Sequence, residues 1–245
     1  NHVDFVWAIH PGKDIKWTEE DMNNVIKKFE MMYKLGVRSF AVFFDDIFGE
    51  GKRGDMQALL LNKINDEFVK VKKDVTPLVM CPTEYNRGWA DPKPGTYLDI
   101  LGDRLDPSIH VMWTGNSGCH DITLEGQQWV NRRIKRPSYV WWNFPVTDSC
   151  RSNLCMGRVY GLASEPGAKE SMGGFVSNPM DKPEASKVSL FGLADYSWNI
   201  NGFKSDEAWK EGVRRLFPKA AEAMQVFVNH NSDQGPNGHG YRREE

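Results

Sequence analysis

Two adjacent carboxylates stand directly after an apolar segment. Residues 37–44 (VRSFAVFF) have the composition of a buried strand, and Asp45 and Asp46 follow them. Because neighbouring strand residues point to opposite faces, both carboxylates reach one site only if the strand ends there and the backbone turns. Two carboxylates in a partly dry pocket do not both ionise easily, so one becomes a proton donor and the other an anion. Such a pair is suited to acid/base chemistry on a glycosidic bond.

Polar side chains also follow the other apolar runs. The residues at these ends are His10, Asp45, Asp46, Cys81, Thr83, Glu84, Tyr85, Thr114, Asn116, Trp141, Trp142, Asn143, Asp148, Ser177 and Asn178. Asn and Asp beside Trp are what a neutral polyhydroxylated ligand requires, because its hydroxyls need polar partners and its flat C–H faces pack on aromatic rings. In another interpretation, Asp45 and Asp46 cap the following segment or bind a cation.

Other classes of function have weaker support. The six His are scattered without an H-E-x-x-H motif, so we expect no metal and no other cofactor. There is no G-x-S-x-G elbow, and Cys81 before Pro82 suits a pocket wall better than a nucleophile. A net charge of −2 argues against a nucleic-acid partner. No apolar run reaches the roughly 18 residues of a membrane span.

The elements that must position these residues alternate between strands and helices. Strands are expected at residues 3–10, 37–44, 78–81, 109–113, 139–142 and 175–177, the first of them buried. Helices are expected after the N-cap Thr18 and over residues 56–71, 96–103, 124–135, 183–198 and 206–228, the last with a kink or break at Pro218. Trp129 and Trp209 fall on helical patterns and are expected in the core.

This alternation predicts an α/β fold built from parallel β-α units. A doubly wound sheet and a (β/α) barrel both fit it. The turn after the first strand, residues 10–13 (HPGK), is not the G-x-G-x-x-G of a dinucleotide-binding sheet, which favours a TIM-type (β/α)8 barrel. Such a barrel needs eight strands, and six are found.

Five strings, in order along the chain, resemble the catalytic barrel of glycoside hydrolase family 84. They are FAVFFDDIFGEG, VMCPTEYN, VMWTG, WWNFPVTD and GFVSNPM. This family comprises β-N-acetylglucosaminidases, including O-GlcNAcases and some bacterial hyaluronidases, and the chain is most similar to enzymes of Bacteroides-type bacteria. The resemblance implies a retaining hydrolase that uses the 2-acetamido group of its substrate as the nucleophile, in place of an enzyme carboxylate.

The resemblance also implies a role for each matching residue. Asp45 would orient and polarise the acetamido N–H and stay charged, and Asp46 would protonate the leaving oxygen and later deprotonate water. The implied substrate-binding residues are Tyr85 near the reaction centre, Cys81, Thr114 and Trp141 around the acetyl methyl group, and Asn143, Asp148 and Asn178 at the sugar hydroxyls. The implied partner is an N-acetylglucosamine-containing glycoside or glycoprotein, and a periplasmic or secreted bacterial location is favoured.

The chain departs from this family at its beginning. The Gly-Phe-Tyr-Gly segment and the sugar-binding Lys of the family's first two strands do not appear, so the chain is expected to supply strands three to eight. Residues 1–230 would form this barrel without its first two β-α units, which could be supplied elsewhere. Residues 231–245 would be a loop leading to an absent C-terminal region.

Two alternatives to the glycosidase stay open at this stage. The same polar residues could bind N-acetylglucosamine without turnover, in a carbohydrate-binding barrel or a pseudoenzyme. Alternatively, Asp45, Asp46 and Asp148 could support metal-dependent hydrolysis. A hyaluronidase-type activity is a further possibility within the family.

Overall fold

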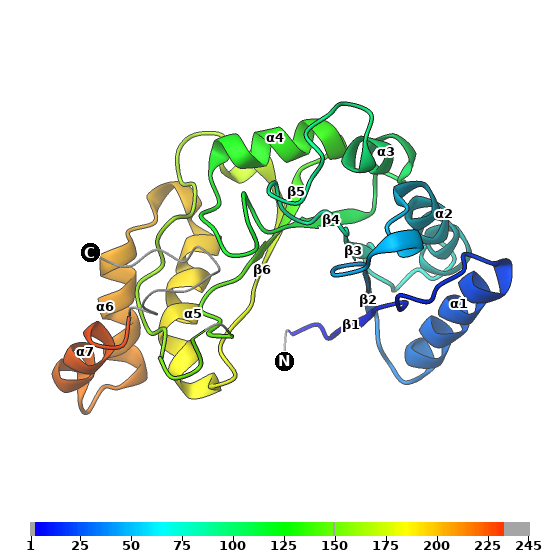
Figure 1. Ribbon diagram of the computed structural model, residues 1–245. Coiled ribbons are helices and arrows are strands. Elements are labelled where there is room, and N and C mark those ends of the chain that lie inside the picture. Colours follow the sequence, from blue (N-terminus) through cyan, green and yellow to red (C-terminus); the bar gives the residue numbers. More distant parts are fainter. Residues whose placement is uncertain (1–2, 149, 233–245) are drawn as a thin grey trace. The chain divides into compact units, whose positions relative to one another are not determined.

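The computed structural model describes residues 3–148 and 150–232 as alternating strands and helices (Figure 1). Within these residues there are six strands, β1 (Val6–Ile9), β2 (Ser39–Phe43), β3 (Val79–Cys81), β4 (His110–Trp113), β5 (Ser138–Trp142) and β6 (Met172–Ser177). Their α-helices are α1 (Glu19–Lys34), α2 (Gly54–Ile64), α3 (Tyr97–Arg104), α4 (Leu124–Ile134), α5 (Pro183–Trp198), α6 (Ser205–Leu216) and α7 (Ala221–Asn229). Each strand from β1 to β4 is followed by a helix, as predicted.

The strands follow one another in chain order and pair in parallel from β1 to β4. Val6 lies opposite Ser39, and Phe43 lies opposite Cys81. Parallel neighbours need a crossover connection, which α1, α2 and α3 provide. The carboxyl ends of β1, β2 and β3 therefore lie at one edge of the sheet, and the residues after these ends can meet there.

The chain divides into two compact units, each with its own apolar core. The first comprises Asn1–Trp113 with Trp129–Tyr139, and the second comprises Thr114–Gln128 with Val140–Glu245. The two clusters of buried apolar side chains follow this division. A single barrel domain over residues 1–230 stays a prediction. Of the loop expected at residues 231–245, only residues 231 and 232 lie within the described part of the chain.

Aromatic packing fills the core of the first unit. Phe29 of α1 and Phe40 of β2 stack with their ring centroids 5.0 Å apart, and Phe68 meets both rings edge-on at 5.5 and 5.0 Å. All three side chains are buried. Aromatic pairs of this kind contribute about 0.5–1.5 kcal/mol each beyond the area that they bury. This packing holds β2, the strand that leads to Asp45.

Helix boundaries follow the capping residues of the sequence. The hydroxyl of Thr18 accepts a hydrogen bond from the backbone N–H of Asp21 at 3.1 Å, which confirms the predicted start of α1. Thr96 and Asp99 form a capping box at the start of α3. Pro218 lies between α6 and α7, so the predicted break is also confirmed. No helix of the described residues is long and apolar enough to cross a bilayer.

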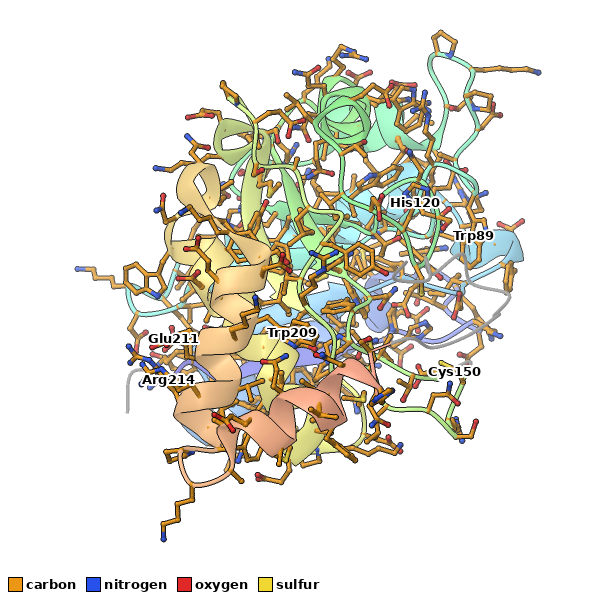
Figure 2. The ribbon with its side chains drawn as sticks, turned by 90° about the vertical axis from the view of Figure 1, so that its left-hand side faces the viewer. Trp89, His120, Cys150, Trp209, Glu211 and Arg214 are labelled. Carbon is orange, nitrogen blue, oxygen red and sulfur yellow. The ribbon has the colours of Figure 1, made fainter. Side chains whose placement is uncertain are left out.

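The helices α5, α6 and α7 lie together in the second unit (Figure 1). Val213 of α6 is buried, and Trp209 packs on the second core with its indole N–H donating to the carbonyl oxygen of Met156 at 2.9 Å. Glu211 and Arg214 form an exposed ion pair on the same helix (Figure 2). α6 is therefore amphipathic, and the expected core position of Trp209 is confirmed.

The first strand differs from its prediction. It was expected to be buried over residues 3–10, but β1 spans Val6–Ile9 and the side chain of Val6 is 49% exposed. Val3 and Phe5, which precede it, are 83% and 67% exposed. The physical reason is that β1 stands at the end of the strand order and pairs along one side, with β2. An apolar run indicates a strand but does not indicate how many neighbours cover it.

A close approach of α3 to α4 generates a stability prediction. A Cβ atom on Gly102 would lie 2.9 Å from Ile134 Cα and 3.0 Å from the Arg133 carbonyl carbon, both of them backbone atoms. We expect Gly102→Ala to lower the free energy of unfolding by about 1–3 kcal/mol in a urea titration. Gly118→Ala is the control, because a Cβ there meets nothing within 4 Å. Equal stability of the two variants would contradict the prediction.

Candidate active site

The backbone turns at the two adjacent carboxylates, as the sequence requires. β2 ends at Phe43, and Asp46 has a positive φ of 54°. This left-handed conformation costs a non-glycine residue energy, although Asp adopts it more readily than most. Asp45 is half-buried, whereas Asp46 is exposed. The turn thus gives the two carboxylates different environments.

One oxygen of Asp45 is buried without a hydrogen-bond partner. Among the described residues, Asp45 Oδ1 is one of a few buried side-chain atoms of this kind. Burial raises the pKa of the Asp45 carboxyl, and the negative charge of Asp46 adds to the rise. A backbone hydrogen bond to the carboxyl and the nearby His10 act against this rise. That Asp45 is the member that stays charged remains a prediction.

His10 holds the backbone of the same turn. The N–H of Gly12 donates to His10 Nδ1 at 3.2 Å, so the proton of a neutral imidazole resides on Nε2. Nε2 lies 2.9 Å from the carbonyl oxygen of Asp45 and donates to it. His10 therefore contacts the candidate catalytic residue through its main chain, from the carboxyl end of β1.

Tyr85 reaches Asp46 from the loop after β3. Its hydroxyl donates to Asp46 Oδ1 at 3.3 Å. Burial raises the pKa of Tyr85 well above its usual value, and the charge of Asp46 adds to this, so the phenol stays protonated and remains a donor. The Tyr85 ring packs at 4.7 Å against the ring of Trp89, which is 51% exposed. The structure thus brings Tyr85 and Asp46 together.

Cys81 ends β3, opposite Phe43 at the end of β2. Its side chain is 1% exposed, and burial raises the pKa of the thiol well above its ordinary value. The neutral thiol is a poor nucleophile, so Cys81 fits the predicted pocket wall.

The other predicted residues belong to the second unit, where three of them meet. Asn143 Oδ1 accepts hydrogen bonds from Trp141 Nε1 and from Asn178 Nδ2, both at 3.0 Å. Asn143 Nδ2 donates to the carbonyl oxygen of Gly118 at 2.5 Å, which fixes the orientation of the amide.

Thr114 and Asp148 have different surroundings within the second unit. Thr114 is buried, and its hydroxyl donates to the carbonyl oxygen of Ser117 at 2.9 Å. Asp148 is exposed. Trp142 packs in the core and stacks on Phe144 at 4.4 Å. Trp141 and Trp142 thus lie on opposite faces of β5, as alternation along a strand requires.

Two residues near the carboxylate turn are not among those that the sequence predicts. Gln57 of α2 and Tyr97 of α3 are buried and bonded to Thr83, next to the end of β2. In the sequence, the signal for Gln57 is a polar residue on the apolar face of its helix. Among the described residues, no three His, Cys, Asp or Glu side chains gather in a way that could hold a metal ion.

The raised pKa of Asp45 generates a prediction about stability. When a carboxyl has a higher pKa in the folded chain than in the unfolded chain, its ionisation destabilises the folded chain. The full loss of stability is present at pH values above the raised pKa. No loss is present below the pKa of the unfolded chain, about 4. Asp45→Asn should therefore raise Tm at pH 7.5 by about 1–3 °C, a small value because solvent screens the half-exposed group. The gain should shrink towards pH 4.

The matched control removes the neighbouring carboxylate. Asp46→Asn acts at an exposed position of the same turn, and we expect it to change Tm by less at both pH values. A loss of stability in Asp45→Asn at pH 7.5, measured by differential scanning calorimetry, would contradict the assignment of a desolvation cost to Asp45.

The chain is similar to a family model, to curated proteins and to solved structures. A family model described as beta-N-acetylglucosaminidase matches residues 1–229. The proteins named Protein O-GlcNAcase from Rattus norvegicus and Mus musculus are each 30% identical over 216 residues, which make up 83% of this chain and 23% of each relative. The solved structure of CpGH84B is 36% identical with a TM-score of 0.89, and the match covers 94% of this chain and 41% of that chain.

A second solved structure, a mutant of the O-GlcNAc hydrolase of Thermobaculum terrenum, is 30% identical with a TM-score of 0.83 and matches 94% of this chain and 51% of that one. The chain thus spans about a quarter of the curated relatives and about half or less of the solved ones. These likenesses confirm the predicted TIM-type (β/α) barrel class. The narrower likeness to Bacteroides-type enzymes and the separate supply of two strands stay predictions. Because the family model matches almost its whole length, the chain belongs to the beta-N-acetylglucosaminidase family of glycoside hydrolases.

Proposed function

We propose that the protein containing this chain removes terminal β-linked N-acetylglucosamine from glycosides, by a retaining reaction in which the acetamido group of the substrate is the nucleophile. The observation that carries this proposal is the buried Asp45 Oδ1, which has no hydrogen-bond partner among the described residues, one residue before an exposed carboxylate. A buried carboxylate oxygen of this kind has room for one further hydrogen bond, which a donor group of a bound ligand can supply.

The acetamido N–H of N-acetylglucosamine is a suitable donor for Asp45. Its hydrogen bond to Oδ1 stabilises the charged carboxylate and offsets the desolvation that raises its pKa. The anion in turn increases the electron density on the acetamido carbonyl oxygen. That oxygen forms a bond to the anomeric carbon, while the bond from this carbon to the leaving oxygen breaks. The resulting oxazolinium-like ring carries positive charge beside Asp45, where the carboxylate stabilises it.

Asp46 completes the proton balance. In its protonated form it gives its proton to the leaving oxygen, and the carboxylate that remains then takes a proton from the incoming water. The water oxygen bonds to the anomeric carbon as the ring opens, which restores the acetamido group with net retention. Exposure of Asp46 gives it access to both the leaving group and water. Tyr85, bonded to Asp46 at 3.3 Å, fixes the orientation of its carboxyl group.

The remaining predicted residues keep their roles as part of this proposal. Cys81 would contact the acetyl methyl group, which its buried neutral thiol supports. Thr114 and Trp141 keep the role at this methyl group that the resemblance implies. Asn143, Asp148 and Asn178 would bind sugar hydroxyls, and the bond between Asn143 and Asn178 orients their amides for this. The relatives named Protein O-GlcNAcase support glycoproteins as the substrate class.

Leaving-group dependence tests this function in the full-length protein. The wild-type protein should hydrolyse aryl β-N-acetylglucosaminides. Asp46→Asn should lose about 10²-fold or more in kcat/KM on substrates with poorly acidic leaving groups, because these need a proton. The loss should be much smaller on activated aryl glycosides, whose leaving groups depart as anions. Steady-state kinetics over a series of substituted phenols provides the comparison.

The outcomes separate the proposal from its alternatives. Equal losses across the series would contradict the assignment of Asp46 as proton donor. Binding of N-acetylglucosamine by a wild-type protein without turnover would identify a sugar-binding protein, and abolition of turnover by chelators would identify a metal-dependent hydrolase.

A further inference from the structure

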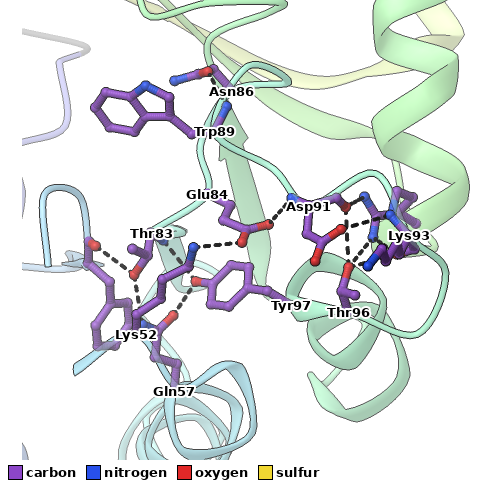
Figure 3. Close-up of polar contacts among 12 residues, drawn as sticks. Lys52, Gln57, Thr83, Glu84, Asn86, Trp89, Asp91, Lys93, Thr96 and Tyr97 are labelled. Carbon is purple, nitrogen blue, oxygen red and sulfur yellow. Dashed lines mark hydrogen bonds and ion pairs between the residues drawn. The ribbon is translucent and has the colours of Figure 1, made fainter. Parts of the chain in front are cut away.

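Three buried polar side chains form a closed ring of hydrogen bonds behind the carboxylate turn (Figure 3). Gln57, Thr83 and Tyr97 are 0%, 6% and 7% exposed. Gln57 Nε2 donates to Thr83 Oγ1 at 2.9 Å, the N–H of Thr83 donates to the hydroxyl oxygen of Tyr97 at 2.8 Å, and that hydroxyl donates to Gln57 Oε1. The ring thereby joins α2, the loop after β3 and the start of α3.

The direction of every hydrogen bond in the ring is determined by one carbonyl. Gln57 Nε2 also lies 2.9 Å from the carbonyl oxygen of Gly51, which can only accept. The amide nitrogen must therefore face Gly51 and Thr83, and the amide oxygen must face Tyr97. Because Thr83 Oγ1 accepts from Gln57, its own proton is available for one further acceptor. That acceptor is the carbonyl oxygen of Phe44, at 2.9 Å.

These contacts bracket the carboxylate turn on both sides. Phe44 immediately precedes Asp45, and its N–H donates to the carbonyl oxygen of Cys81 at 2.9 Å while its carbonyl accepts from Thr83. Gly51 closes the loop that follows the turn, and Gly51 packs so closely on Ile47 that a Cβ there would overlap the Ile47 side chain. The segment that carries both carboxylates is thus held at its two ends by Thr83 and Gln57.

We propose that Thr83 and Gln57 are positioning residues, which hold the Asp45-Asp46 turn in its reactive geometry through the Phe44 and Gly51 carbonyls. This inference rests on the proposed function. Apolar residues of similar volume often stabilise a protein core as much as a buried polar network does. The main effect of a polar network whose hydrogen bonds are all made is to hold the core in one defined structure. Reaction rates, in contrast, are sensitive to displacements of about 1 Å in the reacting groups.

Isosteric variants of Thr83 in the full-length protein test the proposal. Thr83→Val keeps the shape and removes the hydroxyl, and Thr83→Ser keeps the hydroxyl. We expect Thr83→Val to lower kcat on an aryl β-N-acetylglucosaminide by about 10- to 100-fold with KM within about threefold, and Thr83→Ser to retain most of kcat. Thr76→Val is the matched control. It removes a threonine hydroxyl that is bonded to Ser39 near the beginnings of β2 and β3, whereas Thr83 lies after the end of β3.

Hydrogen exchange of residues 44–51, followed by mass spectrometry, reports on the turn without turnover. Exchange should accelerate in Thr83→Val and remain at the wild-type rate in Thr83→Ser and Thr76→Val. Unchanged exchange in Thr83→Val, or equal kcat losses in the Val and Ser variants, would overturn the proposal. If the wild-type protein turns over no substrate while exchange responds as expected, the proposed function fails and the positioning role stands.

Discussion

Burial of one carboxylate oxygen without a hydrogen-bond donor is the constraint on which the rest of the site depends. Asp45 places one oxygen out of water with no hydrogen-bond partner among the described residues, and burial raises its pKa. Such an arrangement costs folding free energy and persists only where the surrounding structure enforces it. In the proposed reaction this cost has a use, since the binding of an acetamido N–H would supply the hydrogen bond that Asp45 Oδ1 lacks.

Core packing, strand register and hydrogen bonds together enforce this arrangement. The packed rings of Phe29, Phe40 and Phe68 fix β2, and the parallel register sets its end beside the end of β3. Hydrogen bonds from His10 and Thr83 then hold two successive carbonyls, those of Asp45 and Phe44. The left-handed backbone of Asp46 is tolerated because the chain is held on both sides of it. Stability and reactivity are therefore opposed at this turn.

The sequence predicted the parts of this structure that local patterns determine. Apolar runs located the strands, Thr18 and Pro218 marked helix boundaries, and the paired carboxylates after a strand indicated the turn. Burial was less predictable, because an apolar run does not reveal that β1 is paired along one side. The ring of Gln57, Thr83 and Tyr97 joins residues 14 to 40 positions apart, so it arises only from tertiary packing. The direction of the Asp45 pKa shift depends mainly on burial of the carboxyl, which no motif displays.

The central claim is that Asp45 serves a nucleophile carried by the substrate, and successive fluorination of the N-acyl group tests it most directly. Each fluorine withdraws electrons from the acetamido carbonyl oxygen. We predict that kcat/KM of the full-length wild-type protein on aryl β-N-acylglucosaminides falls steeply from acetyl to mono-, di- and trifluoroacetyl, by about tenfold or more across the series. An unchanged kcat/KM would show that the acetamido oxygen does not attack the anomeric carbon, and would contradict the account.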